Sequence, residues 1–205
     1  MASQSNPNVL LFLAEGFEDL EAAAVLDVCG WTQYREHIPT VRVTTAAFHE
    51  TVHGRFGLVI KPDLLLAHVN PSDYRALALP GGFHGSGFEE AYDEQVRNLA
   101  RAIHAQGGTI ATFCVGVLPV AEAGLLVGKR ATSYPHSRRH DNLGRLRELG
   151  AVVVEEPLVL DHRIISCAGP AQSIDASLLL LEQVIGAEGA RQVRRFMGCP
   201  PPSAP

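Results

Sequence analysis

Residues 107–126 read GGTIATFCVGVLPVAEAGLL, and the predicted strands and helices on both sides are arranged around this segment. The apolar run 109–113 predicts a buried strand, and the Ala-rich segment after Gly116 has helical character. Cys114 stands at the corner between them. A strand that turns abruptly into a helix exposes and strains its corner residue, as in a nucleophile elbow, and the helix dipole there favours a thiolate. The alternative is a small buried hydrophobe, as most free cysteines are.

The pattern on either side of this corner alternates between strands and helices. Continuous apolar runs predict strands buried on both faces, as in a parallel sheet. Strands are expected at 8–14, 41–45, 76–79, 109–113, 129–133, 152–154, 158–160 and 164–167, and helices at 19–29, 90–106, 141–149, 174–185 and 188–196. We also expect a hairpin within 49–62 and a helical or irregular segment at 64–68. This order predicts an α/β sandwich with a mostly parallel sheet and helices on both faces.

Length and composition limit the class of protein to which this chain can belong. With 205 residues, 46% hydrophobic and 19% charged, we expect one soluble domain over 1–205, with an ordered core at about 8–196 and a proline-rich tail at 197–205. The net charge of −5 and scattered basic residues argue against nucleic acid as a partner. The basic clusters at 137–140 and 191–195 are expected to be solvated helix faces.

The cysteines and the N-terminal sequence indicate a reducing compartment. Four cysteines form no CxxC pair and have no metal-ligand spacing with the histidines, so we expect no bound metal. The N-terminus lacks a secretory pattern, and no apolar run is long enough for a bilayer. We therefore expect a cytoplasmic protein without a membrane partner.

Four segments should meet at the carboxyl ends of the parallel strands, where ligands bind in such sheets. They are residues 15–21, the glycine-rich loop 80–87, residues 114–116, and residues 134–136. The glycine-rich loop lacks a GKS or GKT ending, which argues against a phosphate loop.

The ordered set of motifs resembles the DJ-1/PfpI (ThiJ/PfpI) superfamily, of the class I glutamine amidotransferase-like type. It comprises GFEDLE (16–21), LPGG (79–82), ATFCVG (111–116), AGLL (123–126), ATSYP (131–135) and SCAGP (166–170). The resemblance covers nearly the whole chain and implies a flavodoxin-like sandwich. It also implies a homodimer formed through the helix after the first strand.

The resemblance implies that Cys114 is the nucleophile and that Glu21 lies against its sulfur. A carboxylate beside a thiolate would repel it, so one proton is shared or held by the acid. Protonated Glu21 would donate a hydrogen bond to the thiolate and lower the pKa of the thiol. The alternative is that Glu21 only caps backbone amides at the helix start. Glu15 and Glu18 are competing carboxylates.

The same resemblance implies that the backbone N–H groups of Gly82 and Val115 polarise a substrate oxygen. Two positions depart from better-studied members. Tyr134 replaces a histidine at the end of the following strand, and Val115 replaces a histidine directly after the cysteine. Without a Cys-His dyad, peptidase activity is not expected. Tyr134, His84 and His136 remain candidates for the pocket wall or for proton transfer.

Three functions fit this constellation. The first is a cofactor-independent glyoxalase III-like or deglycase-like enzyme, in which Cys114 attacks a small electrophilic carbonyl compound. The second is an isonitrile hydratase-like lyase, although that branch usually has aspartate at the position of Glu21. The third is a non-enzymatic redox sensor of stress, in which Cys114 forms a sulfinate that Glu21 hydrogen-bonds.

Overall fold

A seven-stranded sheet forms the centre of the molecule in the computed structural model, which describes residues 7–200. Its strands are β1 (Asn8–Phe12), β2 (Arg42–Ala47), β5 (Leu64–Leu65), β6 (Ala76–Leu79), β7 (Thr109–Phe113), β10 (Leu158–Asp161) and β11 (Ile164–Cys167). They lie in the order β10-β11-β7-β6-β1-β2-β5. Only the hairpin β10–β11 is antiparallel, so the expected mostly parallel sheet is confirmed.

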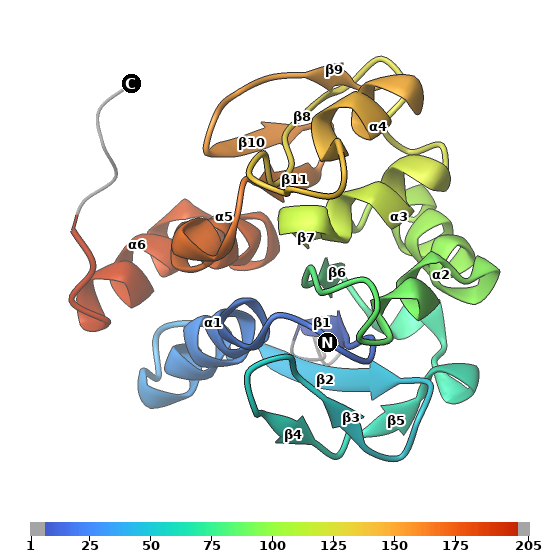
Figure 1. Cartoon of the computed structure of the whole chain (residues 1–205). Helices are drawn as coiled ribbons and strands as arrows, with labels where there is room; N and C mark the ends of the chain where they lie inside the picture. Colours follow the sequence, from blue (N-terminus) through green and yellow to red (C-terminus); the bar gives the residue numbers. More distant parts are fainter. Residues whose placement is uncertain (1–6, 201–205) are drawn as a thin grey trace.

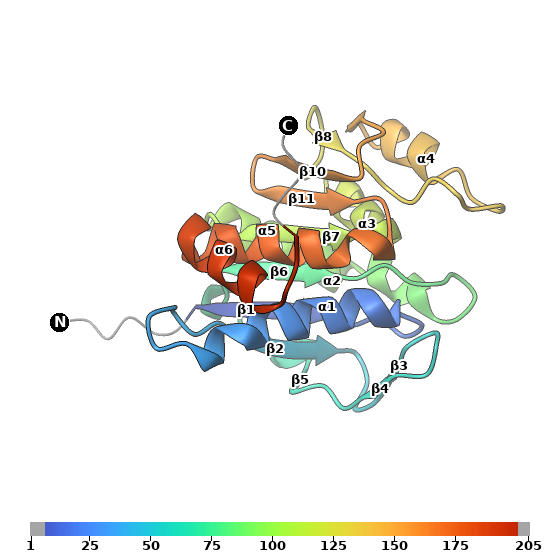
Figure 2. The ribbon, with the colours of Figure 1, turned by 90° about the vertical axis from the view of Figure 1, so that its left-hand side faces the viewer.

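Helices cover both faces of this sheet (Figure 1). One face carries α1 (Asp19–Gly30), α5 (Ser173–Ile185) and α6 (Ala187–Phe196), and Figure 2 shows these three helices in front of the strands. The other face carries α2 (Glu94–Ala105) and α3 (Val117–Glu122). Successive strand side chains point to opposite faces. Leu10 and Phe12 therefore pack in one apolar core, whereas Val9 and Leu11 pack in the other.

The remaining elements lie outside the large sheet. Strands β3 (Val52–His53) and β4 (Val59–Ile60) form the expected hairpin, and β8 (Arg130–Ala131) pairs in parallel with β9 (Val152–Val153). Helix α4 (Asn142–Glu148) lies beside this second pair (Figure 1). No helix formed by residues 7–200 is long and apolar enough to cross a membrane.

Three local expectations are wrong in whole or in part. Leu64 and Leu65 form an edge strand paired with β2, because a run of two residues is too short to show a period, whereas Leu66–His68 form a 3₁₀ helix as the expected helical segment allowed. The long helix begins at Glu94 rather than at residue 90, since Asp93 accepts the Gln95 N–H and caps it. The basic cluster at 137–140 lies in an irregular connection before α4 and not on a helix face.

Candidate active site

Cys114 occupies a strained backbone position at the end of β7. Its φ is +51°, although Phe113 before it is still extended, and a 3₁₀ turn (Cys114–Gly116) then leads into α3. A left-handed conformation costs a non-glycine residue about 1–2 kcal/mol. Gly116 allows the turn to pack closely, because a Cβ there would lie 2.4 Å from the Leu79 carbonyl oxygen. The expected sharp corner is therefore present, with the Cys114 side chain only partly buried.

Glu21 meets the same corner from the first turn of α1. Its side chain is fully buried, and its Oε2 accepts a 2.6 Å hydrogen bond from the Gly81 N–H. Its Oε1 has no hydrogen-bond partner among the described residues. A Cβ at Gly81 would lie 2.8 Å from the Cys114 Cβ and 3.1 Å from the Glu21 Oε2. The Cys114 Cβ and the Glu21 carboxyl group thus both lie against Gly81, at a position where a side chain would clash with them.

The two competing carboxylates have other partners. Glu18 is the N-cap of α1, and its Oε2 accepts the Glu21 N–H at 2.8 Å. Glu15 accepts a hydrogen bond from the backbone N–H of His53, and its Oε1 lies 3.0 Å from the Nδ1 of the His53 ring. The capping role that remained open for Glu21 in the sequence is therefore filled by Glu18, which leaves one oxygen of Glu21 free.

Burial determines the ionisation of this pair. It raises the pKa of Glu21 to about 8, against the hydrogen bond from Gly81, and the charge of Glu18 adds to the rise. Burial also raises the pKa of the Cys114 thiol, as does a charged Glu21, whereas the Val115 N–H lowers it. A thiolate at rest, as expected from the helix dipole, is not supported. Desolvation of the sulfur is the largest influence on the pKa of the thiol, and the Val115 N–H does not outweigh it.

The two acids therefore hold both protons at neutral pH. The first proton leaves from the pair as a unit, so two forms of the singly ionised site exist. In one form Glu21 is the carboxylate and Cys114 keeps its proton, and in the other Cys114 is a thiolate while Glu21 keeps its proton. The second form is the nucleophile.

A pocket of about 560 Å³ opens in front of the Cys114 side chain. Four other candidates from the sequence also line it: Gly82, Val115, Tyr134 and His84. His84 is half-buried, and its Nε2 lies 3.2 Å from the Tyr92 hydroxyl oxygen. Burial and the neighbouring His140 lower the pKa of His84, so its imidazole is neutral at pH 7.

His136 is not brought into this pocket. It is exposed and is not among the lining residues, and its ring stands edge-on to Tyr134 with the centroids 5.6 Å apart. The pocket wall instead includes Arg138, Arg139 and His140, which the sequence did not indicate as site residues. Only the position of this basic run, directly after the predicted strand at 129–133, could have suggested it.

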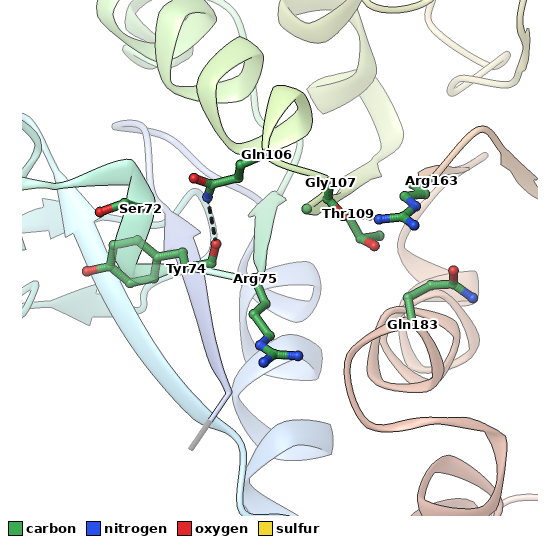
Figure 3. A pocket seen from close by; sticks show the side chains of 9 residues that line it. Ser72, Tyr74, Arg75, Gln106, Gly107, Thr109, Arg163 and Gln183 are labelled. Carbon is green, nitrogen blue, oxygen red and sulfur yellow. Dashed lines mark hydrogen bonds between the residues drawn. The ribbon is translucent and has the colours of Figure 1, made fainter. Parts of the chain in front are cut away.

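A second pocket of about 500 Å³ lies at the opposite ends of the strands from Cys114, next to the amino ends of β6 and β7 (Figure 3). Arg75, Thr109 and Arg163 line it, and the Gln106 side chain donates to the Tyr74 carbonyl oxygen at 3.0 Å. It contains no cysteine and no carboxylate among its lining residues. Within residues 7–200, no three His, Cys, Asp or Glu side chains are grouped so that they could hold a metal ion. The Cys114 pocket is therefore the candidate site for covalent chemistry.

Several known proteins are similar to this chain in sequence and in fold. Protein DJ-1alpha of Drosophila melanogaster is 32% identical over 193 residues, which cover 93% of this chain and 83% of that protein. A deglycase of Pyrococcus horikoshii is 29% identical, covering 80% of this chain and 90% of the relative. An isonitrile hydratase of Pseudomonas putida is 33% identical, covering 67% of this chain and 57% of the relative.

The solved structures and the family model agree with these similarities. The crystal structure of Drosophila melanogaster DJ-1beta has a TM-score of 0.81 and 27% identity, covering 96% of this chain and all of that chain. The model of the DJ-1/PfpI family matches residues 7–183, which is most of the sequence. The chain belongs to the DJ-1/PfpI family.

Proposed function

We propose that this protein is a cofactor-independent enzyme that uses Cys114 to transform small reactive carbonyl compounds, in the manner of a glyoxalase or deglycase. One observation carries the proposal: a partly exposed thiol lies beside a buried carboxyl group whose pKa is raised to about 8. Such a pair can supply a nucleophile and a proton carrier from the same site. The similarity to a deglycase of Pyrococcus horikoshii supports an enzymatic function of the deglycase type.

The reaction of a 2-oxoaldehyde follows from these two groups. The Cys114 thiolate bonds to the aldehyde carbon, and the carbonyl oxygen takes up the proton of Glu21, which gives a hemithioacetal and leaves Glu21 as a carboxylate. The Glu21 carboxylate then removes the proton from that carbon, which leaves an enediol. Protonation of the neighbouring carbon yields a thioester, and water hydrolyses it to a 2-hydroxy acid and the free thiol. The N–H groups of Gly82 and Val115 would stabilise the negative oxygen.

A second candidate is hydration of an isonitrile, which the similarity to the Pseudomonas putida isonitrile hydratase supports. Cys114 would attack the terminal carbon while Glu21 protonates it, and water would release the thiol with a formamide as the product. The same pair would also serve a redox sensor, because an accessible sulfur that ionises beside an acid can be oxidised to a sulfinate.

A substrate panel tests the proposal. Methylglyoxal and a small alkyl isonitrile are supplied to the wild-type protein and to Cys114→Ser, and lactate and the formamide are measured. We expect lactate from the wild type only. Turnover by Cys114→Ser would show that another group is the nucleophile, and formamide without lactate would identify a hydratase. No turnover, with selective oxidation of Cys114 by peroxide, would favour the sensor.

A further inference from the structure

Two arginines give the Cys114 pocket a positive charge that the chain as a whole lacks. The net charge of the protein is −5, yet Arg138 and Arg139 both line this pocket. Neither guanidinium forms an ion pair with any carboxylate in residues 7–200, whereas Arg130 and Arg145 on either side of them do. The lining thus carries two permanent positive charges without partners.

The segment that carries these arginines is anchored at both ends. Before it, the Thr132 N–H donates to the Ser166 Oγ at 3.0 Å, and after it the buried Asn142 side chain donates to the Tyr134 carbonyl oxygen at 2.9 Å. Between them, the Ser137 Oγ accepts the backbone N–H groups of residues 139 and 140. These hydrogen bonds fix the backbone of the segment next to the pocket, while the side chains of Arg138 and Arg139 are exposed.

The nearby carboxylates are bound to backbone amides. Glu18, which also lines the pocket, accepts the Glu21 N–H, and burial raises its pKa. Asp141 accepts the Gly144 N–H at the start of α4, and Glu89 accepts the Gly85 N–H. None of the three makes an ion pair with Arg138 or Arg139, so an anion entering the pocket meets two guanidinium groups with free donors.

Part of the remaining lining is apolar, and it limits what can lie between the anion and the reacting carbon. Phe56, Phe83 and Pro170 line the pocket together with Cys114. A short hydrocarbon segment fits such a wall, with a reactive carbon at one end and a charged group at the other.

We propose that the pocket selects electrophiles that carry an anionic group, a carboxylate or a phosphate, which Arg138 and Arg139 bind while Cys114 attacks the reactive carbon. The assignment of the reactive carbon to a carbonyl compound rests on the proposed function. The selection by charge does not, because it acts on any electrophile that reaches the sulfur.

Paired alkylating agents test the charge selection without turnover. Iodoacetate and iodoacetamide transfer similar groups to a thiol, but only the first is an anion. The alkylation rate constants at Cys114 are measured by peptide mass spectrometry, with Cys199 in the same molecule as the internal reference. For Arg138→Gln/Arg139→Gln, we expect the iodoacetate-to-iodoacetamide ratio at Cys114 to fall by about 10-fold or more, as for lost charge-assisted hydrogen bonds.

Matched variants separate this effect from net charge. Arg75→Gln/Arg147→Gln removes the same charge from exposed positions outside the Cys114 pocket, and it should leave the ratio unchanged. Arg138→Lys/Arg139→Lys should restore most of it. An unchanged ratio in Arg138→Gln/Arg139→Gln, or an equal fall in the control, would overturn the inference.

Turnover then identifies the anionic group. Wild-type kcat/KM is compared for methylglyoxal, a 2-oxoaldehyde with a terminal carboxylate, and one with a terminal phosphate. We expect one of the anionic compounds to exceed methylglyoxal, and the Arg138→Gln/Arg139→Gln variant to lose that preference. Equal values for all three would contradict anion selection while the proposed function stands. Turnover of none would contradict the proposed function, and the alkylation ratio would still decide the charge selection.

Discussion

Replacing Glu21 with glutamine tests whether this carboxyl group keeps its proton in the folded protein. Its pKa rises from 4.5 to about 8 on folding because the side chain is buried. The folded protein then holds a proton that the unfolded chain releases above about pH 4.5, so the contribution of Glu21 to the free energy of unfolding is largest below that pH. This contribution falls by about 1.4 kcal/mol per pH unit as the pH rises to about 8, a total of about 5 kcal/mol.

Glutamine keeps the shape of the side chain, and its oxygen can still accept the Gly81 N–H, but it has no proton to lose. The stability of Glu21→Gln relative to wild type should therefore increase with pH between about pH 5 and about pH 8. Urea unfolding at closely spaced pH values measures this difference. The exposed Glu50→Gln is the matched control and should show no such trend. Parallel curves for wild type and Glu21→Gln would refute a neutral, buried Glu21.

Three further substitutions test the geometry of the corner. Gly81→Ala places a methyl group 2.8 Å from the Cys114 Cβ, so we expect folded protein that has lost alkylation at Cys114 and turnover, as judged by circular dichroism and both assays. Gly116→Ala places a methyl group 2.4 Å from the Leu79 carbonyl oxygen and should lower the free energy of unfolding by about 1–3 kcal/mol, as measured by chemical denaturation. An unchanged denaturation midpoint would contradict this close packing. Because Cys114 has a φ of +51°, Cys114→Gly should be more stable than Cys114→Ala by about 1 kcal/mol, and the reverse order would exclude backbone strain.

Apolar runs and helix periods predicted the sheet and its helices because each long element buries a face that leaves a pattern in the sequence. Leu64 and Leu65 could not be predicted in this way, since their pairing with β2 depends on the edge of a sheet formed elsewhere. The small parallel pair β8–β9 likewise depends on how the chain returns past α4.

At the site, the family resemblance implied that Glu21 lies near Cys114, and in the structure the Cys114 Cβ and the Glu21 Oε2 both lie next to Gly81. The ionisation state of the Cys114 thiol could not be predicted from the sequence in the same way. Whether a thiol is charged depends on how much water its pocket excludes, and the sequence gives no measure of this. The position of Arg138 at the pocket could not be predicted for a related reason. A basic run is usually solvated, and only the path of the connecting chain places this one at the pocket.

The pH dependence of alkylation at Cys114 by iodoacetamide tests the central pairing most directly. In the wild type, the rate should rise through about pH 8, where the thiol and Glu21 together release their first proton. In Glu21→Gln that transition should disappear, and the rise should move to higher pH, where the buried thiol ionises alone. The same profile in both proteins would show that Glu21 takes no part in activating the sulfur.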